Sequence, residues 1–261
     1  MMAGQDPILQ YLSLWLLIGF RFVGTIFSSP VFTASSLPLA VRFWMALLLA
    51  GTAMAGWDGS APAVLFEAPA ALLLACAREF LIGVILGFLS GAPFYALQIS
   101  GELIGTTMGL SMVSLLDPLS EEQVVIVAQL QFAVGLWFFF RWNGHILLTQ
   151  ALVESLKLLP PGAVNFFKPG DMRLGAWLQS IFNLGVRFTI PYYGALLLAD
   201  IGLGFLARTV PQMNIFILGL PLKMGLGLFL LMVVFPLTVD LIAPMVDSFL
   251  EVALQGIMAL R

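Results

Sequence analysis

Residues able to carry out chemistry are scarce in this sequence. His145 is the only histidine and Cys76 the only cysteine in a chain of 261 residues. Neither a His-Glu-x-x-His zinc motif nor a Cys-x-x-Cys pair occurs, and no nucleophile and base combine into a catalytic group. Gly202-x-Gly204-x-x-Ala207 matches a dinucleotide fingerprint only formally, because it lies inside an apolar run with no strand before it. We therefore predict that the protein is not an enzyme and has no catalytic, cofactor-binding or metal-binding residues.

Ionisable side chains inside apolar stretches form a second group. A charge at the centre of a membrane helix costs about 2.5–3.5 kcal/mol, whereas each Leu or Phe returns only about 0.3–0.6 kcal/mol. Several such charges together favour burial against partners or water. Long arginines near helix ends, here Arg21, Arg42 and Arg141, can instead extend to the membrane interface. We expect polar contacts with other subunits, or within their assembly, at Arg78, Glu79, Glu102, Asp200, Arg208 and Lys223, and at the amides of Gln212 and Asn214. For Glu102 the sequence leaves two roles open, pairing with a partner's cation and lining a channel.

The elements that position these residues must suit a membrane. Hydrophobic residues make up 61% of the chain and charged residues only 10%, whereas a soluble domain is about a quarter charged. This composition excludes a water-soluble monomer and predicts contact with membrane lipid. The 11 basic and 14 acidic residues form no run of either sign, which excludes nucleic acid as a partner.

Apolar runs predict an all-α integral membrane protein. A membrane span needs about 20 residues, and six segments approach or exceed that length: 8–27, 37–54, 70–90, 124–140, 176–206 and 215–241. Two further stretches, 92–116 and 146–159, are interrupted or short. Prolines lie inside or beside many segments, so we expect kinked, Pro/Gly-interrupted hydrophobic helices. No linker divides the chain, which predicts one helical domain over residues 1–261 with six to eight hydrophobic helical segments.

Two glycine ladders mark faces for close helix packing. Gly83, Gly87 and Gly91 are spaced by four residues, as are Gly101, Gly105 and Gly109. This spacing places each set on one helix face, where another backbone can approach closely. The spacing leaves open whether the neighbour is in the same chain or in another subunit.

An apolar loop follows the second ladder. It comprises Gly109, Leu110, Ser111, Met112, Val113, Ser114, Leu115, Leu116, Asp117 and Pro118. Its backbone cannot face lipid, because its polar groups would lack partners there. It is therefore expected inside a protein environment, either as a buried connection or in a functional position.

The residues that match a known family are spread along most of the chain. The C-terminal motif contains Asp200, Arg208, Pro211, Gln212, Asn214, Phe216, Gly219, Pro221, Leu222 and Lys223. Further matches are Gly101, Glu102 and Gly105 leading to the loop, Pro30 to Phe32 with Arg42, and Asn143 to His145 with Leu159 and Pro160. In these residues the chain resembles the FliR family of the flagellar type III export apparatus, which includes virulence-secretion counterparts.

The resemblance implies a structural, pore-forming subunit of the flagellar export gate in the bacterial inner membrane, at the flagellar basal body. It implies assembly with FliP-type and FliQ-type subunits, an FlhB-type protein bound outside, and passage of exported unfolded protein chains. It also implies that the loop from Gly109 to Pro118 plugs the pore, although Met112 and Leu115 stand where phenylalanines are common. The alternative is a multi-span secondary transporter for a small solute or ion, against which the lack of a visible inverted repeat counts.

Overall fold

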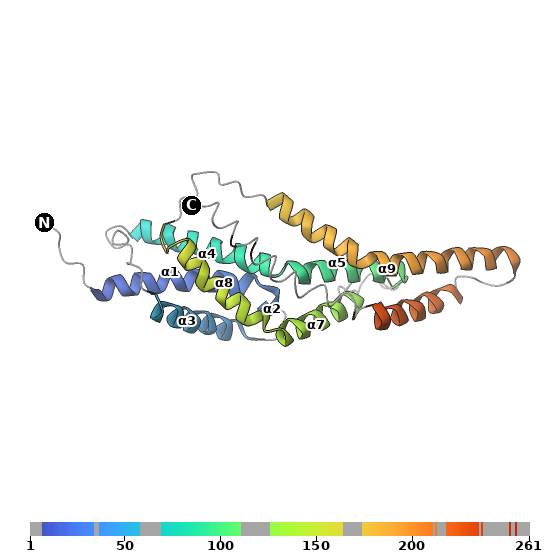
Figure 1. Ribbon diagram of the computed structural model, residues 1–261, viewed down its shortest axis with the longest axis horizontal. Coiled ribbons are helices and arrows are strands. Elements are labelled where there is room, and N and C mark those ends of the chain that lie inside the picture. Colours follow the sequence, from blue (N-terminus) through green and yellow to red (C-terminus); the bar gives the residue numbers. More distant parts are fainter. Residues whose placement is uncertain are drawn as a thin grey trace. The chain divides into compact units, whose positions relative to one another are not determined.

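The computed structural model describes residues 7–33, 37–57, 69–110, 126–163, 174–210, 212, 218–234, 236, 251 and 254. Every regular element in these ranges is a helix, which confirms the all-α class. The labelled helices in Figure 1 are α1 (Pro7–Ser28), α2 (Pro30–Thr33), α3 (Leu39–Ala55), α4 (Pro69–Ser90), α5 (Ala92–Thr107), α7 (Ile126–Arg141), α8 (Gly144–Leu158) and α9 (Leu174–Thr209). A further helix, Leu218–Val234, follows α9 along the chain.

Prolines set where several helices begin. Pro7, Pro30 and Pro69 are the first residues of α1, α2 and α4, and Pro38 precedes α3 as its N-cap. A proline is tolerated in the first turn because the N–H that it lacks has no partner within the helix there. Pro191 is different, since it lies inside α9 and the helix continues through it.

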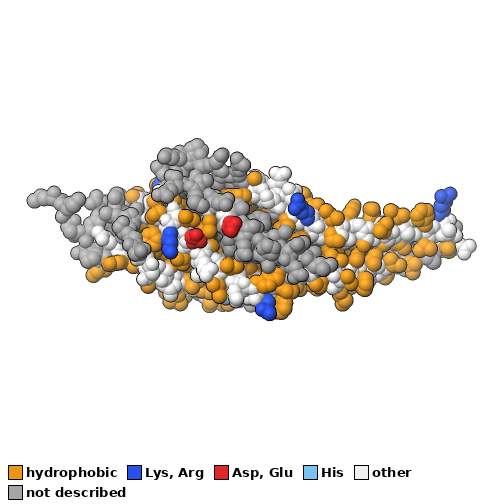
Figure 2. All heavy atoms as spheres, in the orientation of Figure 1, with side chains coloured by type: hydrophobic (Ala, Val, Ile, Leu, Met, Phe, Trp, Pro, Cys, Tyr) orange, Lys and Arg blue, Asp and Glu red, His pale blue; other side chains and the backbone are white. Residues whose placement is uncertain are grey.

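Three helices are long and apolar enough to cross a membrane, judged by length and composition among the described residues. They are Gln10–Ser28, Ala70–Ser90 and Gly175–Thr209, while Leu39–Ala55, Ile126–Arg141 and Leu218–Val234 are apolar but shorter. Figure 2 shows hydrophobic side chains over much of the described surface, with only scattered charged ones. These observations confirm an integral membrane protein, with three full-length candidates among the six expected segments.

One compact unit contains the described parts of Met1–Ala92, Asn143–Leu174 and Val246–Arg261. Within it, α1 packs along α4 and α3 (Figure 1). Leu17, Phe22 and Ile26 of α1 are fully buried, as are Ile82 and Leu86 of α4. The core of this unit therefore lies along the long helices α1 and α4.

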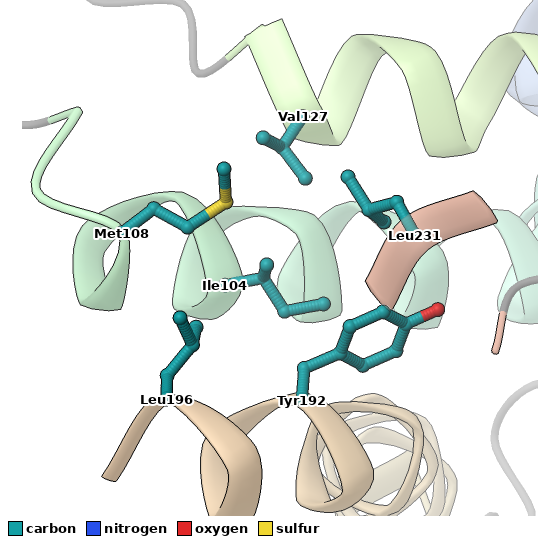
Figure 3. Packing of buried hydrophobic residues seen from close by; sticks show 6 residues of the cluster. All are labelled: Ile104, Met108, Val127, Tyr192, Leu196 and Leu231. Carbon is teal, nitrogen blue, oxygen red and sulfur yellow. The ribbon is translucent and has the colours of Figure 1, made fainter. Parts of the chain in front are cut away.

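The other unit contains the described parts of Pro93–Trp142 and Gly175–Met245. Figure 3 shows its hydrophobic cluster, in which side chains from α5, α7, α9 and Leu218–Val234 meet. The buried members are Ile104, Met108, Val127, Tyr192, Leu196 and Leu231. The single helical domain expected from the sequence over residues 1–261 stays a prediction.

Candidate functional site

A buried ion pair joins the first two long helices. The Arg21 Nε of α1 donates a hydrogen bond of 2.6 Å to Glu79 Oε2 of α4, and both side chains are fully buried. An unpaired charge in this position would be strongly unfavourable, so each group neutralises the other. Arg21 therefore does not extend to the membrane interface, which was one of its two expected positions.

The same pair also holds α8 and the segment after it. Arg21 Nη1 donates to Ser155 Oγ at 3.2 Å, and Arg21 Nη2 donates to the Leu159 carbonyl at 3.0 Å. The second carboxylate oxygen of Glu79 accepts a bond of 2.9 Å from the Gly162 N–H. Two charged side chains thus connect α1, α4, α8 and the backbone that follows α8, a network that we call the Arg21 clamp.

The first glycine ladder packs against α1 of the same chain. A Cβ atom added at Gly83 would lie 2.9 Å from the Arg21 carbonyl carbon, and one added at Gly87 would lie 3.0 Å from Thr25 Cα. Gly24 of α1 contributes from the other side, because its added Cβ would lie 3.0 Å from the Val84 nitrogen. This close approach lets Thr25 Oγ1 donate to the Gly83 carbonyl at 3.0 Å. The glycine spacing alone could not identify the neighbouring helix, and the structure shows that it is α1. Gly91, the third glycine of the ladder, is buried just beyond the end of α4.

The second ladder is also enclosed by its own chain. A Cβ atom at Gly101 would lie 2.7 Å from the Ala128 nitrogen of α7, and Gly105 is buried. Glu102, between these two glycines, is exposed. The carboxylate thus lies outside this helix contact and is open to another group.

The expected pore loop begins at a defined helix end. Gly109 has a φ of +86°, and its N–H bonds to the Thr106 carbonyl while the Leu110 N–H bonds to the Gly105 carbonyl, each at 3.0 Å. This pair of bonds is a Schellman motif, which ends a helix at a left-handed glycine. Leu110 then packs against the cluster around Met108. Ser111, Met112, Val113, Ser114, Leu115, Leu116, Asp117 and Pro118 lie outside the described residues.

Two residues of the C-terminal motif form a pair. Lys223 Nζ of Leu218–Val234 makes an ion pair with Asp200 Oδ1 of α9, and both side chains are partly exposed. Arg208 and Gln212 are exposed, Arg78 is half-buried, and Asn214 lies outside the described residues. The structure therefore brings together Asp200 and Lys223, while the intersubunit role expected for the whole polar set stays a prediction.

Several members of the Arg21 clamp were not among the sequence candidates. Ser155 and Gly162 were missed, Leu159 was named only as a family match, and Arg21 was not assigned a partner. The available signal was the lone charge of Arg21 in α1 and the charges of Arg78 and Glu79 in α4, since a charge inside a long apolar helix calls for a partner. Within the described residues no group of three or more His, Cys, Asp or Glu side chains could hold a metal ion. The arrangement fixes helices against one another.

Comparison with known proteins gives the family. Bacterial export proteins, family 1, match residues 12–249. Flagellar biosynthetic protein FliR of Escherichia coli strain K12 is 29% identical over 234 residues, covering 89% of this chain and 88% of that protein. FliR of Aquifex aeolicus strain VF5 is 30% identical over 229 residues, 87% of each chain. The secretion system apparatus protein SsaT of Salmonella typhimurium is 30% identical over 159 residues, 60% of this chain and 61% of SsaT.

The family match takes in both structural units. It begins within α1 and ends beyond Leu218–Val234, so it includes the Arg21 clamp, both glycine ladders and the C-terminal motif. This extent confirms the resemblance seen in the motif from Asp200 to Lys223. The chain belongs to the bacterial export proteins of family 1, the FliR family, and is a membrane component of a bacterial export apparatus.

Proposed function

We propose that the chain is a structural, pore-forming subunit of the flagellar type III protein export gate. In this role it assembles with FliP-type and FliQ-type subunits, with an FlhB-type protein bound outside. The assembly passes unfolded flagellar proteins across the inner membrane at the flagellar basal body. Family membership supports the proposal, and one structural observation carries it, namely the length and exposure of α9.

Helix α9 is longer than a single membrane span, and the rest of the chain covers little of its surface. Its 36 residues extend about 54 Å at 1.5 Å per residue, whereas the hydrocarbon core of a bilayer is about 30 Å thick. Only 17% of its most apolar stretch is buried within the chain. Leu178 and Phe205, near its two ends, and Leu198 between them are all exposed. Lipid covers only part of this length, so the remaining apolar surface calls for other protein chains.

The flagellar branch is favoured over the virulence branch by coverage. FliR of Escherichia coli and FliR of Aquifex aeolicus align over 89% and 87% of this chain, whereas SsaT aligns over 60%. A shared architecture along the whole chain is expected of proteins with the same place in an assembly. We therefore assign the exported cargo to flagellar proteins.

Closure of the pore is assigned to the loop from Gly109 to Pro118. The Schellman motif at Gly109 fixes where the chain leaves α5, and Leu110 anchors that point on the hydrophobic cluster. An apolar constriction stops ions by excluding water, without any charged group. Met112 suits a closure that must yield to passing chains, because an unbranched side chain adapts its shape.

A leak assay tests this role. Met112→Ser and Leu115→Ser together should let ions or small solutes through the resting gate while assembly persists, because two hydroxyls allow water into the constriction. Membrane conductance and small-molecule uptake are measured in cells that express the whole gate. The matched control is Leu48→Ser, at an exposed position on α3, which should leave the gate closed. An assembled double variant as tight as the parent would assign the seal to another subunit.

A further inference from the structure

The unit that contains α5 and α9 has a groove between these two helices. The larger part has a volume of about 560 Å³ and is lined by apolar side chains that include Leu103, Val186 and Ile190. A smaller hollow of about 200 Å³ contains Asp200 and Lys223. Thr106, Thr107 and Tyr193 line both, so the two hollows form one feature, the α5–α9 groove.

The wall of the larger part suits hydrocarbon. Its three threonine hydroxyls are already used, because Thr106, Thr107 and Thr189 donate to the carbonyls of Leu103, Ile104 and Gly185 at 2.8 to 2.9 Å. A satisfied hydroxyl does not require a polar ligand. Tyr192 and Leu196 point from α9 toward Ile104 of α5 (Figure 3), so the floor beside the groove is a packed apolar cluster.

The polar end carries both signs of charge. Lys223 Nζ and Asp200 Oδ1 are paired, and about half of the Asp200 side chain remains exposed. A ligand group that also carries both signs can place its anion at Lys223 and its cation at Asp200. A purely anionic group would approach the Asp200 carboxylate unfavourably.

The length of the groove suits a hydrocarbon chain. From Val186 to Gly194 the apolar part follows α9 for about 12 Å, and Asp200 lies about 21 Å from Val186 along the helix. Half of the hydrocarbon core is about 15 Å thick. The groove therefore matches one acyl chain of one leaflet, with its headgroup at the charge pair.

We propose that the α5–α9 groove is a specific site for a zwitterionic phospholipid, whose acyl chain lies along Ile190 and Gly194 and whose phosphate and ammonium groups meet Lys223 and Asp200. The site rests on the membrane location of the chain and goes beyond its proposed export role.

Glycines of α9 provide a matched pair of variants. Gly194 lines the groove, and a Cβ atom added there meets nothing within 4 Å. Gly194→Phe should therefore fill the groove without displacing backbone. Gly204 is equally open on the same helix but does not line the groove, which makes Gly204→Phe the control. Ile190→Trp, at an exposed groove position, carries the same expectation should Gly194→Phe fail to accumulate.

The test is retention of phospholipid by the purified assembly. The chain is extracted with its co-expressed partners, exchanged into detergent, supplied with phosphatidylethanolamine or phosphatidylglycerol, and weighed by native mass spectrometry. The parent and Gly204→Phe should retain phosphatidylethanolamine at least tenfold better than Gly194→Phe. Lys223→Met combined with Asp200→Asn should abolish the preference for phosphatidylethanolamine over phosphatidylglycerol.

Three results would overturn the site. They are equal retention by the two glycine variants, no retained lipid in the parent, and a parent preference for phosphatidylglycerol. If Gly194→Phe and Ile190→Trp instead release a partner subunit, the groove holds a protein segment and the lipid assignment is wrong. Export is assayed separately, so loss of lipid with intact export leaves the proposed export function standing.

Discussion

Arg21 and Glu79 share a hydrogen bond of 2.6 Å between two apolar helices, and neither side chain reaches the surface of the chain. Thr25 and Gly83 meet one helical turn further along the same two helices. Because both residue numbers rise together, α1 and α4 run parallel, and the ion pair fixes their register. A shift by one turn would separate the two charges.

Removing the charge of Glu79 should destabilise the unit that contains α1 and α4. Glu79→Gln leaves the guanidinium of Arg21 buried without a counter-charge, which typically costs about 3–5 kcal/mol. We expect a lower melting temperature for the detergent-solubilised assembly and less chain in the membrane. Arg21→Met with Glu79→Leu should restore most of the stability, because a well-packed apolar pair can replace a buried ion pair. A Glu79→Gln protein that melts with the parent would mean that the clamp contributes nothing.

Close packing predicts a strong effect of side chains on the glycine ladders. At Gly87 even a Cβ atom would lie 3.0 Å from Thr25 Cα, so Gly87→Leu must force α1 and α4 apart. We expect loss of the assembled complex, measured by gel filtration after detergent extraction, and the same for Gly105→Leu at a buried position of α5. Gly202→Leu is the control, because nothing lies within 4 Å of its added Cβ. Normal assembly of both ladder variants would contradict the close-packing account.

The helix end at Gly109 should set the direction of the pore loop. An alanine there would have to hold a φ of +86°, at a cost of about 1–2 kcal/mol. Its Cβ would also lie 2.6 Å from Leu220 Cδ1. Gly109→Ala should therefore increase ion leak through the resting gate while the complex still assembles, as measured by membrane conductance. Gly225→Ala, with open space around its Cβ, should leave the gate closed to ions. Equal conductance of the two variants would show that Gly109 has no role in closing the pore.

Much of the fold could be predicted because apolar runs are local. The apolar run 70–90 corresponds to the helix Pro69–Ser90, and the run 176–206 corresponds to the helix Leu174–Thr209. Pro191 shows the limit of such local rules. Proline in a helix interior removes one hydrogen bond, yet α9 continues through it, with Phe188 and Tyr192 buried on either side. Packing of these side chains outweighs the local preference.

The candidate site was less accessible to sequence reasoning. The ladders at Gly83 and Gly101 located two contact faces, but spacing could not say that α1 and α7 cover them. Arg21 and Glu79 are 58 residues apart, and α3 lies between them along the chain. Their pairing depends on how three helices fold back on one another, which no local pattern records. The bonds to Leu159 and Gly162 use backbone groups, which carry no residue-type signal at all.

Arg208 should contact another subunit. Its side chain is exposed near the end of α9, so reversing its charge should not disturb the fold of the chain itself. Arg208→Glu is expected to lower the yield of the complex and motility at least several-fold, because a like charge would then face a partner's acid. Arg208→Lys, which keeps the charge, is the control. Full complex yield and motility for Arg208→Glu would show that the Arg208 side chain faces solvent and contacts no other subunit.

The central claim is that this chain functions within an export gate rather than alone. The most direct measurement is the size of the tagged chain after mild detergent extraction, with and without co-expressed FliP-type and FliQ-type subunits, followed by mass spectrometry of the purified material. We predict one stoichiometric complex with the partners, and aggregation or loss of the chain without them, because α9 then lacks its protein cover. A stable monomer or small homo-oligomer that retains neither partner would contradict the account and favour a transporter.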